Sequence, residues 1–282
     1  MTVQDTDTAG NFEGVSAAWY NNDVDFETLL LDVTDGVATV TLNRPEAMNS
    51  FNETMCNEVR DLWQHLRTND DVRAVVLTGS GERAFCAGVD RDQAEFAWDP
   101  LLYEDPGRLL GPKTQELWKP VISVVNGIAC GGAFYFLGES DVIIAADHAQ
   151  FFDPHVTYSM MAVYEPILLL PMMPFGEVMR MALAGNHERI SAQRAHDVGF
   201  VSEVLPLDEA LASAQQLARA IASAPTRTIQ TTVRTLWAAR SLTPQQATEL
   251  GNVFLHLATT VDALNEGQDV FSSGARVKPK IR

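Results

Sequence analysis

The chain has 282 residues, of which 46% are hydrophobic and 20% are charged, a balance that supports a sizeable buried core and argues against general disorder. Its 20 Lys and Arg residues and 37 Asp and Glu residues give a formal net charge of −17. Nucleic acids and anionic membranes are bound through Lys and Arg, so neither kind of partner is expected.

The sequence also lacks the signals for export or for crossing a membrane. No Lys or Arg precedes Arg44, so the N-terminus has no charged region typical of a signal peptide. The richest apolar run, residues 167–173, is far shorter than the roughly 18 residues that a membrane-spanning helix needs. The three cysteines form no CxxC pair, which favours reduced thiols and predicts a cytoplasmic protein without a metal site.

The first expected elements are a leader, a hairpin and a helix. Residues 1–24 are polar, acidic and without periodicity, which predicts a mobile leader that carries no chemistry. The segments Thr28–Val33 and Val37–Leu42 are rich in β-branched and aliphatic residues and predict a β-hairpin. Asn52 is a suitable N-cap for a helix running to about Arg67, because apolar residues follow it at helical spacing.

Strands and helices then alternate along the chain. Three short apolar segments are expected to be strands: Ala74–Thr78, Val121–Val125 and Val142–Ala146. Helices are expected around Thr114–Trp118 and from a glycine-rich turn to Gly138. This alternation predicts βαβ units and a mostly parallel sheet buried on both faces. From Glu177 onward only helices are predicted, over Glu177–Leu183, Ser191–Asp197, Asp208–Ala222, Thr226–Arg240, Pro244–Ala258 and Val261–Phe271.

Four segments, in this order along the chain, resemble the crotonase (enoyl-CoA hydratase/isomerase) superfamily. They are Leu42–Ser50, similar to the family's coenzyme A loop; Ala84–Asp90, which matches F-x-A-G-x-D; Val125–Ala133, which matches N-G-x-A-x-G-G; and Leu183–Val204, similar to the family's helix pair. The resemblance covers about residue 26 to the C-terminus. It implies an α/β fold with a ββα spiral core over residues 25–204 and a C-terminal helical oligomerisation region over residues 205–282.

The second and third segments place glycine at the C-terminal end of a strand, where backbone N–H groups point outward and no side chain blocks a ligand. Two such groups that converge on one oxygen form an oxyanion hole, which stabilises the enolate of a thioester. The resemblance assigns these donors to the amides of Val89 and Gly132. The alternative is that the glycines only permit tight turns. Neither turn fits a dinucleotide or ATP motif.

The resemblance also implies contacts with coenzyme A, which would be bound as part of the substrate and not as a tightly held cofactor. The positions that match the family's coenzyme A contacts are Arg44, Ala47, Asn49, Ala87 and Asp90.

The expected catalytic positions depart from the hydratase pattern. In a typical hydratase of the family, two glutamates share the added water, and their positions here are occupied by Tyr135 and His155. A histidine is a competent acid or base, and a tyrosine can orient water. Asp153 would point to the same side as His155 in an extended segment, and Glu165 could enter the pocket if the loop between them folds back.

Each of these residues also has a structural interpretation. Tyr135 could pack in the core, Asp153 could cap a turn, and Glu165 could begin a helix. Glu139 lies one helical turn after Tyr135 and could share its face. An apolar run could line an acyl pocket or belong to the core: Phe151, Phe152, Tyr158, Met160, Met161 and Tyr164.

The C-terminus carries four bases, Arg276, Lys278, Lys280 and Arg282. In the family, an aromatic and basic residues of the last helix reach coenzyme A in a neighbouring subunit, which assigns this role to Phe271 and Lys278. A solvated tail is the alternative. The resemblance further implies a homotrimer or a homohexamer.

The expected activity is that of an acyl-CoA enzyme, a lyase or isomerase of the enoyl-CoA hydratase/isomerase type, which works through a thioester enolate. An efficient straight-chain hydratase is not expected, because both glutamates are replaced. Two alternatives stay open. One is C–C bond hydrolysis of a β-diketone or a decarboxylation on the same fold. The other is a non-catalytic acyl-CoA binding protein.

Overall fold

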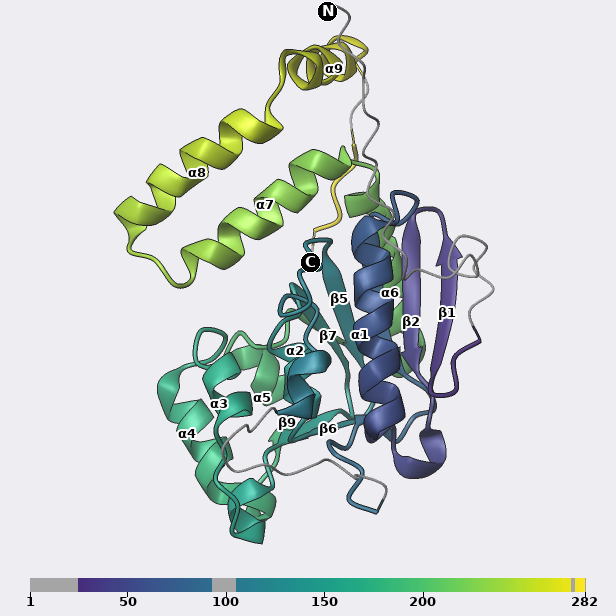
Figure 1. Ribbon diagram of the computed structural model, residues 1–282, viewed down its shortest axis with the longest axis vertical. Helices are drawn as coiled ribbons and strands as arrows, with labels where there is room; N and C mark the ends of the chain where they lie inside the picture. Colours follow the sequence, from purple (N-terminus) through teal and green to yellow (C-terminus); the bar gives the residue numbers. More distant parts are fainter. Residues whose placement is uncertain (1–24, 93–104, 275–276, 282) are drawn as a thin grey trace, which may run out of the picture.

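The computed structural model describes residues 25–92, 105–274 and 277–281 (Figure 1). The leader predicted for residues 1–24 lies outside these ranges. A hairpin opens the described chain, with strands β1 (Leu29–Thr34) and β2 (Val37–Leu42) paired in antiparallel register. Its two turn residues, Asp35 and Gly36, have φ angles of 54° and 75°, which is the backbone of the tight turn that joins twisted strands. The hairpin prediction is confirmed.

The main sheet has six strands in the order β1-β2-β3-β5-β7-β10. Strand β1 is antiparallel to its neighbour and all other pairs are parallel. Every residue of β3 and β5 is buried, which confirms the prediction of a parallel sheet covered on both faces. The bounds of the four strands not yet named are β3 Ala74–Gly79, β5 Val121–Val125, β7 Val142–Ala146 and β10 Glu203–Leu205.

One long helix covers each face of this sheet (Figure 1). Helix α1 (Glu53–Thr68) packs its apolar side against one set of alternating strand residues, and α6 (Leu207–Ala222) packs a row of alanines against the other. The side chain of Asn52 accepts a hydrogen bond from Met55 N at 3.0 Å, which confirms the predicted N-cap. The division of the chain at residues 204 and 205 stays a prediction. Helix α6 follows this division in sequence and packs on the main sheet.

A second sheet, which the sequence pattern did not indicate, has the order β4-β6-β8-β9. Strands β4 (Ala84–Cys86), β6 (Ile128–Cys130) and β8 (Gln150–Phe152) are parallel, and the two-residue β9 (Ile190–Ser191) is antiparallel to β8. Parallel strands end at the same edge, so the turns after β4, β6 and β8 lie side by side.

Two sequence predictions are wrong. The helix expected around Thr114–Trp118 is only a set of turns, because Glu116 has φ +60°, a left-handed conformation that a helix excludes. The region after Glu177 is not purely helical, since β9 and β10 lie within it. Both strands are too short to show a period-2 pattern, and β10 is stabilised by its pairing with β7 at the sheet edge.

Shorter helices surround the second sheet, and three helices extend from the body (Figure 1). The shorter elements are η2 Pro45–Ala47, η3 Pro106–Leu109, α2 Ala133–Leu137, η4 His155–Tyr158, α3 Tyr164–Leu169, α4 Phe175–Ala184, η5 Gly185–His187 and α5 Ala192–Asp197. The projecting helices are α7 Thr226–Ala239, α8 Pro244–Ala258 and α9 Val261–Ser272. Neither α7 nor α8 has a buried residue. In the part of the chain that the structure describes, no helix combines the length and apolarity needed to cross a bilayer.

Candidate active site

Three neighbouring parallel strands deliver the candidate site at one edge of the second sheet. Strand β4 leads into the turn at Gly88, β6 leads into Gly131 and Gly132, and β8 leads into Asp153 and His155. Ligands bind most often outside the carboxyl ends of parallel strands, where turns present backbone and side-chain groups. The fold therefore gathers both glycine turns and the candidate acid/base residue in one place.

The two glycine turns are in contact. A Cβ atom placed on Gly88, whose φ is +86°, would lie 3.0 Å from the carbonyl oxygen of Cys130 and 3.3 Å from the amide nitrogen of Gly132. Only glycine fits at position 88, because a side chain there would be strained by the positive φ and would crowd the second turn.

The amides of Val89 and Gly132 are placed as ligand donors would be. Phe51 N donates to Gly88 O at 2.9 Å and Asp90 N donates to Phe51 O at 2.8 Å, so this parallel bridge directs the N–H of Val89 away from Phe51. Gly132 is the N-cap of α2, and the first amides of a helix have no partner within it. These features support the predicted oxyanion hole.

His155 lies between two buried carboxylates. Its Nδ1 is 2.5 Å from Asp153 Oδ1, and its Nε2 is 3.7 Å from Glu165 Oε1. Because a carboxylate only accepts, Nδ1 carries the proton of that hydrogen bond and Nε2 faces Glu165. Asp153 is fully buried, and the side chain of Glu165 is 6% exposed. The structure therefore brings together three of the four predicted catalytic residues.

The surroundings shift two of these groups. The hydrogen bond that His155 donates to Asp153 raises the pKa of His155 above its usual 6.5, although burial works against it. Burial raises the pKa of Glu165 above its usual 4.5, while the nearby His155 partly opposes this rise. Both groups therefore hold a proton more tightly than they do in water.

The fourth predicted residue, Tyr135, lies on the other side of the glycine turn. A Cβ atom placed on Gly131 would lie 3.8 Å from His155 Cε1, and one placed on Gly132 would lie 3.6 Å from Tyr135 Cδ2. The hydroxyl of Tyr135 donates a hydrogen bond to Asp105 Oδ2. Asp105 stands in no motif beyond a turn-forming Asp-Pro-Gly, because only the packing of the fold brings it to Tyr135.

The side chains of the predicted coenzyme A loop hold the loop together. Arg44 forms an ion pair with Asp90 at 2.8 Å, and its guanidinium also donates to Ser50 O at 2.6 Å. The side chain of Asn49 is fully buried and donates to Ala84 O at 2.8 Å and Ser80 O at 3.0 Å. Arg44, Asn49 and Asp90 thus shape the loop, and contacts of coenzyme A with it, or with the half-buried Ala47 and Ala87, stay a prediction.

Helix α9 lies far from this site in the same chain. Figure 1 places α9 at the opposite end of the molecule from α3 and α4. Phe271 on α9 is 67% exposed and Lys278 is exposed, while Lys280 pairs with Glu203 of the same chain at 3.1 Å. That Phe271 and Lys278 reach coenzyme A in a neighbouring subunit stays a prediction.

The apolar run divides into core and surface. Phe151 and Phe152 are buried, whereas Tyr158, Met160, Met161 and Tyr164 are exposed beside His155, with exposed fractions of 37% to 83%. The guanidinium of Arg91 lies 4.8 Å from the centre of the Tyr158 ring, so the segment after Val89 approaches the segment after His155. The exposed part of the run therefore forms an apolar surface beside the site.

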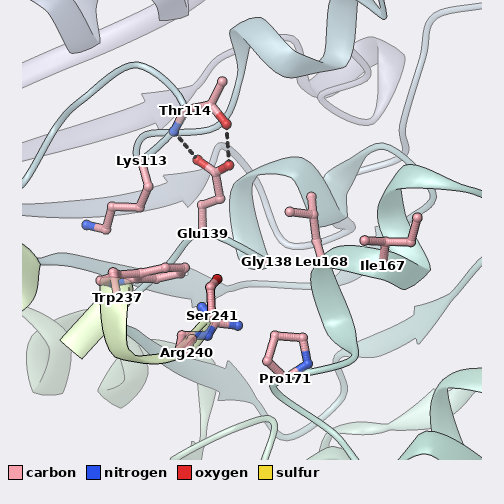
Figure 2. A pocket seen from close by; sticks show the side chains of 10 residues that line it. All are labelled: Lys113, Thr114, Gly138, Glu139, Ile167, Leu168, Pro171, Trp237, Arg240 and Ser241. Carbon is pink, nitrogen blue, oxygen red and sulfur yellow. Dashed lines mark hydrogen bonds between the residues drawn. The ribbon is translucent and has the colours of Figure 1, made fainter. Parts of the chain in front are cut away.

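A separate cavity of about 330 Å³ lies between α2, α3 and α7, and Figure 2 shows its lining. Glu139 in its wall accepts hydrogen bonds from Thr114 N at 2.7 Å and from Thr114 Oγ1 at 2.5 Å. Both oxygens of Glu139 are thus used to hold the turn that replaces the expected helix. Glu139 is a structural residue here and lies outside the group around His155.

Asp153, His155 and Glu165 each offer one ligand atom, and these atoms lie within 4.8 Å of one another. This donor set could hold a metal ion. In the described structure, the imidazole is hydrogen-bonded to Oδ1 of Asp153.

Comparisons with known proteins find similar sequences and a similar fold. A family model described as enoyl-CoA hydratase/isomerase matches residues 32–278. The chain is 33% identical to (E)-benzylidenesuccinyl-CoA hydratase of Thauera aromatica over 257 residues, which cover 89% of this chain and 98% of the relative. It is 39% identical to 1,2-epoxyphenylacetyl-CoA isomerase of Escherichia coli (strain K12) over 209 residues, which cover 71% and 78%. An enoyl-CoA hydratase/isomerase structure from Mycobacterium paratuberculosis matches with a TM-score of 0.80 and 33% identity, covering 89% of this chain and 97% of that one.

Proposed function

The chain belongs to the enoyl-CoA hydratase/isomerase family, and from that premise we propose that it adds water to an α,β-unsaturated acyl-CoA through a thioester enolate, with His155 as a proton-transfer group. The family relationship makes it an acyl-CoA enzyme, and the α/β crotonase fold is confirmed. The observation that carries the proposal is the position of His155, held by Asp153 and facing Glu165, directly beside the Gly131-Gly132 turn.

The backbone supplies the electrostatic part of the mechanism. As water attacks the β-carbon, the electron pair of the double bond moves toward the thioester oxygen, which becomes an enolate. The amides of Val89 and Gly132 would donate hydrogen bonds to this oxygen. Such preorganised donors contribute about 3 to 4 kcal/mol each in other enzymes. Because both donors belong to the backbone, their positions depend on the turns and not on side-chain rotamers.

The side chains supply the proton transfer. With Nδ1 bonded to Asp153, the other ring nitrogen of His155 is the one available to the substrate. Protonated at this nitrogen, the imidazolium delivers its proton to the α-carbon and the thioester carbonyl forms again. Glu165, whose pKa is raised by burial, lies on the same side and can return a proton to His155. A positioned acid or base of this kind contributes roughly 10²- to 10⁴-fold in rate.

We also propose an aromatic acyl group as the substrate class. The names of two relatives specify benzylidenesuccinyl and epoxyphenylacetyl thioesters. In this chain, the exposed side chains of Tyr158, Met160 and Tyr164 form an apolar surface beside His155. Thioether and aromatic side chains are suited to contact with a flat aromatic ring. The replacement of both hydratase glutamates also agrees with a substrate other than a straight-chain enoyl group.

Assembly and location complete the proposal. Exposed apolar residues on α8 and α9, among them Leu255, Leu257 and Leu264, support a homotrimer or a homohexamer. The free, buried cysteines Cys56 and Cys130 support a reducing, cytoplasmic location.

A second candidate is C–C bond hydrolysis of a β-diketone, which is favoured by one observation. The hydrogen bond that His155 donates to Asp153 makes the imidazole a stronger base, and such a base could activate water against a carbonyl carbon. A non-catalytic acyl-CoA binding protein would not be expected to keep this buried pair of carboxylates, which is costly unless it is used or paired.

The proposal is tested by binding and by exchange of the α-protons. Acetoacetyl-CoA, which resembles the enolate, should bind in calorimetry, and free acetoacetate should not. In D₂O, phenylpropionyl-CoA should lose its α-protons, and His155→Gln should slow this exchange at least about 100-fold with little change in acetoacetyl-CoA affinity. The exposed His187→Gln is the matched control. Exchange that survives in His155→Gln would contradict the assigned role, and absence of thioester binding would favour the β-diketone alternative.

A further inference from the structure

We propose that Asp105 is the second proton-transfer residue of the site, acting opposite His155 and held in place by Tyr135. The inference deepens the proposed function and rests on it. Water addition needs one group that takes a proton from water and one that gives a proton to carbon. His155 lies beside Gly131 and Tyr135 lies beside Gly132, so the two side chains flank the turn, and Asp105 is the carboxylate bonded to Tyr135.

Both oxygens of Asp105 are fixed. Oδ1 accepts a hydrogen bond from Gly107 N at 3.0 Å, so that Asp105 is the N-cap of η3, and Oδ2 accepts the hydrogen bond from the hydroxyl of Tyr135. A carboxylate held by two donors keeps one orientation, as a residue that positions water requires. Two lone pairs remain on these oxygens to accept a proton or to bind a water molecule.

The loop that carries Asp105 lies flat against Tyr135. A Cβ atom placed on Gly107 would fall 2.5 Å from Tyr135 Cζ, so only glycine allows this close approach. Tyr135 in turn packs beside Gly132, the residue whose amide faces the thioester oxygen in the proposed mechanism. A continuous set of contacts thus leads from Asp105 through Tyr135 to the oxyanion turn.

The charge of Asp105 also acts on the other acid/base groups. Its negative charge contributes to the raised pKa of His155 and to the raised pKa of Glu165, in addition to the larger effects of Asp153 and of burial. Charges that are far apart or fully hydrated are screened and leave no such effect. Asp105 therefore carries its charge close enough to act on both groups.

The chemical step is balanced with these groups. The carboxylate of Asp105 takes one proton from water, the water oxygen bonds to the β-carbon, and the C=C electron pair moves to the thioester oxygen. His155 then gives its proton to the α-carbon and the carbonyl forms again. One water molecule is consumed, Asp105 ends protonated and His155 ends neutral, and proton exchange with solvent restores both. Tyr135 acts as a positioning residue that orients Asp105.

The test separates water addition from enolate formation. Asp105→Asn keeps the size and hydrogen-bonding atoms of the side chain but removes the base. Hydration of cinnamoyl-CoA should fall at least about 100-fold, while exchange of the α-protons of phenylpropionyl-CoA in D₂O should stay within about threefold of wild type. Retained exchange also shows that the variant is folded. Glu116→Gln, which removes an exposed carboxylate from the same segment, should change neither rate.

Every other outcome would overturn either the role of Asp105 or the proposed function. Unchanged hydration in Asp105→Asn would overturn the proposal, and so would an equal loss of hydration and exchange, because the residue would then support the whole site. Exchange without any hydration in the wild type would overturn the water-activating role of Asp105. Absence of exchange in the wild type would instead overturn the enolate mechanism of the proposed function.

Discussion

Asp153 holds His155 twice: its Oδ1 lies 2.5 Å from the ring Nδ1 and accepts a hydrogen bond from the backbone N at 3.0 Å. The second oxygen of Asp153 is buried without a hydrogen-bond partner among the described residues. A buried carboxylate with one unsatisfied oxygen is costly. Its presence here indicates that it is kept for its effect on the imidazole, which it orients and whose protonated form it stabilises.

Asp153→Asn should lower the pKa of His155. The hydrogen bond with Asp153 is the main cause of the raised pKa, and burial, which remains in the variant, works in the opposite direction. If the imidazolium donates the proton, activity falls as pH rises through this pKa, and in the variant the fall should occur at lower pH. The measurement is a pH–rate profile of hydration with NMR titration of His155. Asp147→Asn, which breaks the exposed Asp147–His148 pair, is the control and should leave the profile unchanged.

Gly132→Ala should reduce turnover at least about 100-fold. The added methyl group would lie 2.7 Å from Phe51 Cζ, so either the ring or the turn has to move, and the amide of Gly132 moves with it. Gly176→Ala in α4 is the control, since a Cβ atom there meets nothing within 4 Å and should stabilise the helix by about 0.5 to 1 kcal/mol. Turnover in both variants, measured with thermal unfolding, checks this. Full activity in Gly132→Ala would argue against its amide as an oxyanion donor.

Glu165→Gln should make stability less dependent on pH. The pKa of Glu165 is raised in the folded protein, so the folded state binds this proton more tightly than the unfolded state, and the stability gained by protonation is lost as pH rises through the folded pKa. Urea unfolding at pH 5 and pH 8 should show a smaller loss of stability in the variant than in the wild type. An equal loss in both proteins would show that Glu165 does not carry this linkage.

Charged substitutions on the projecting helices should dissociate the proposed oligomer. Leu255 on α8 is 57% exposed and Leu264 on α9 is 59% exposed, so neither contributes to the core of one chain. Leu255→Glu together with Leu264→Glu should convert a trimer or hexamer to monomers, as measured by light scattering during size-exclusion chromatography. Gln245→Glu on the same projection is the control. A wild-type monomer would refute the assembly, and an unchanged oligomer in the double variant would place the interface elsewhere.

The long elements of this fold could be predicted from sequence because their patterns repeat. Helix α1 has six buried residues at helical spacing and an asparagine cap, and strands β3 and β5 are continuous apolar runs. The second sheet could not be predicted, since strands of two or three residues have no measurable period. Their pairing depends on contacts between segments that are far apart in the chain.

The candidate site, like the fold, could be predicted only in part. His155, Asp153 and the glycine turns follow from their places in short motifs. The approach of Glu165 to His155 depends on how residues 156–163 fold back, and the sequence could suggest this only as one possibility. Asp105 had no motif at all, because its meeting with Tyr135, 30 residues later, is created by packing.

Strands β4, β6 and β8 end at the same edge of the second sheet, and this has an evolutionary consequence. The turns after β4 and β6 offer main-chain amides, whose chemistry is the same whatever side chains surround them, whereas the turn after β8 offers side chains. Substitutions at the end of β8 can therefore exchange the candidate acid/base group and leave the proposed oxyanion turns intact. New reactions can arise on such a scaffold by small steps, each beginning from a protein in which these turns are already in place.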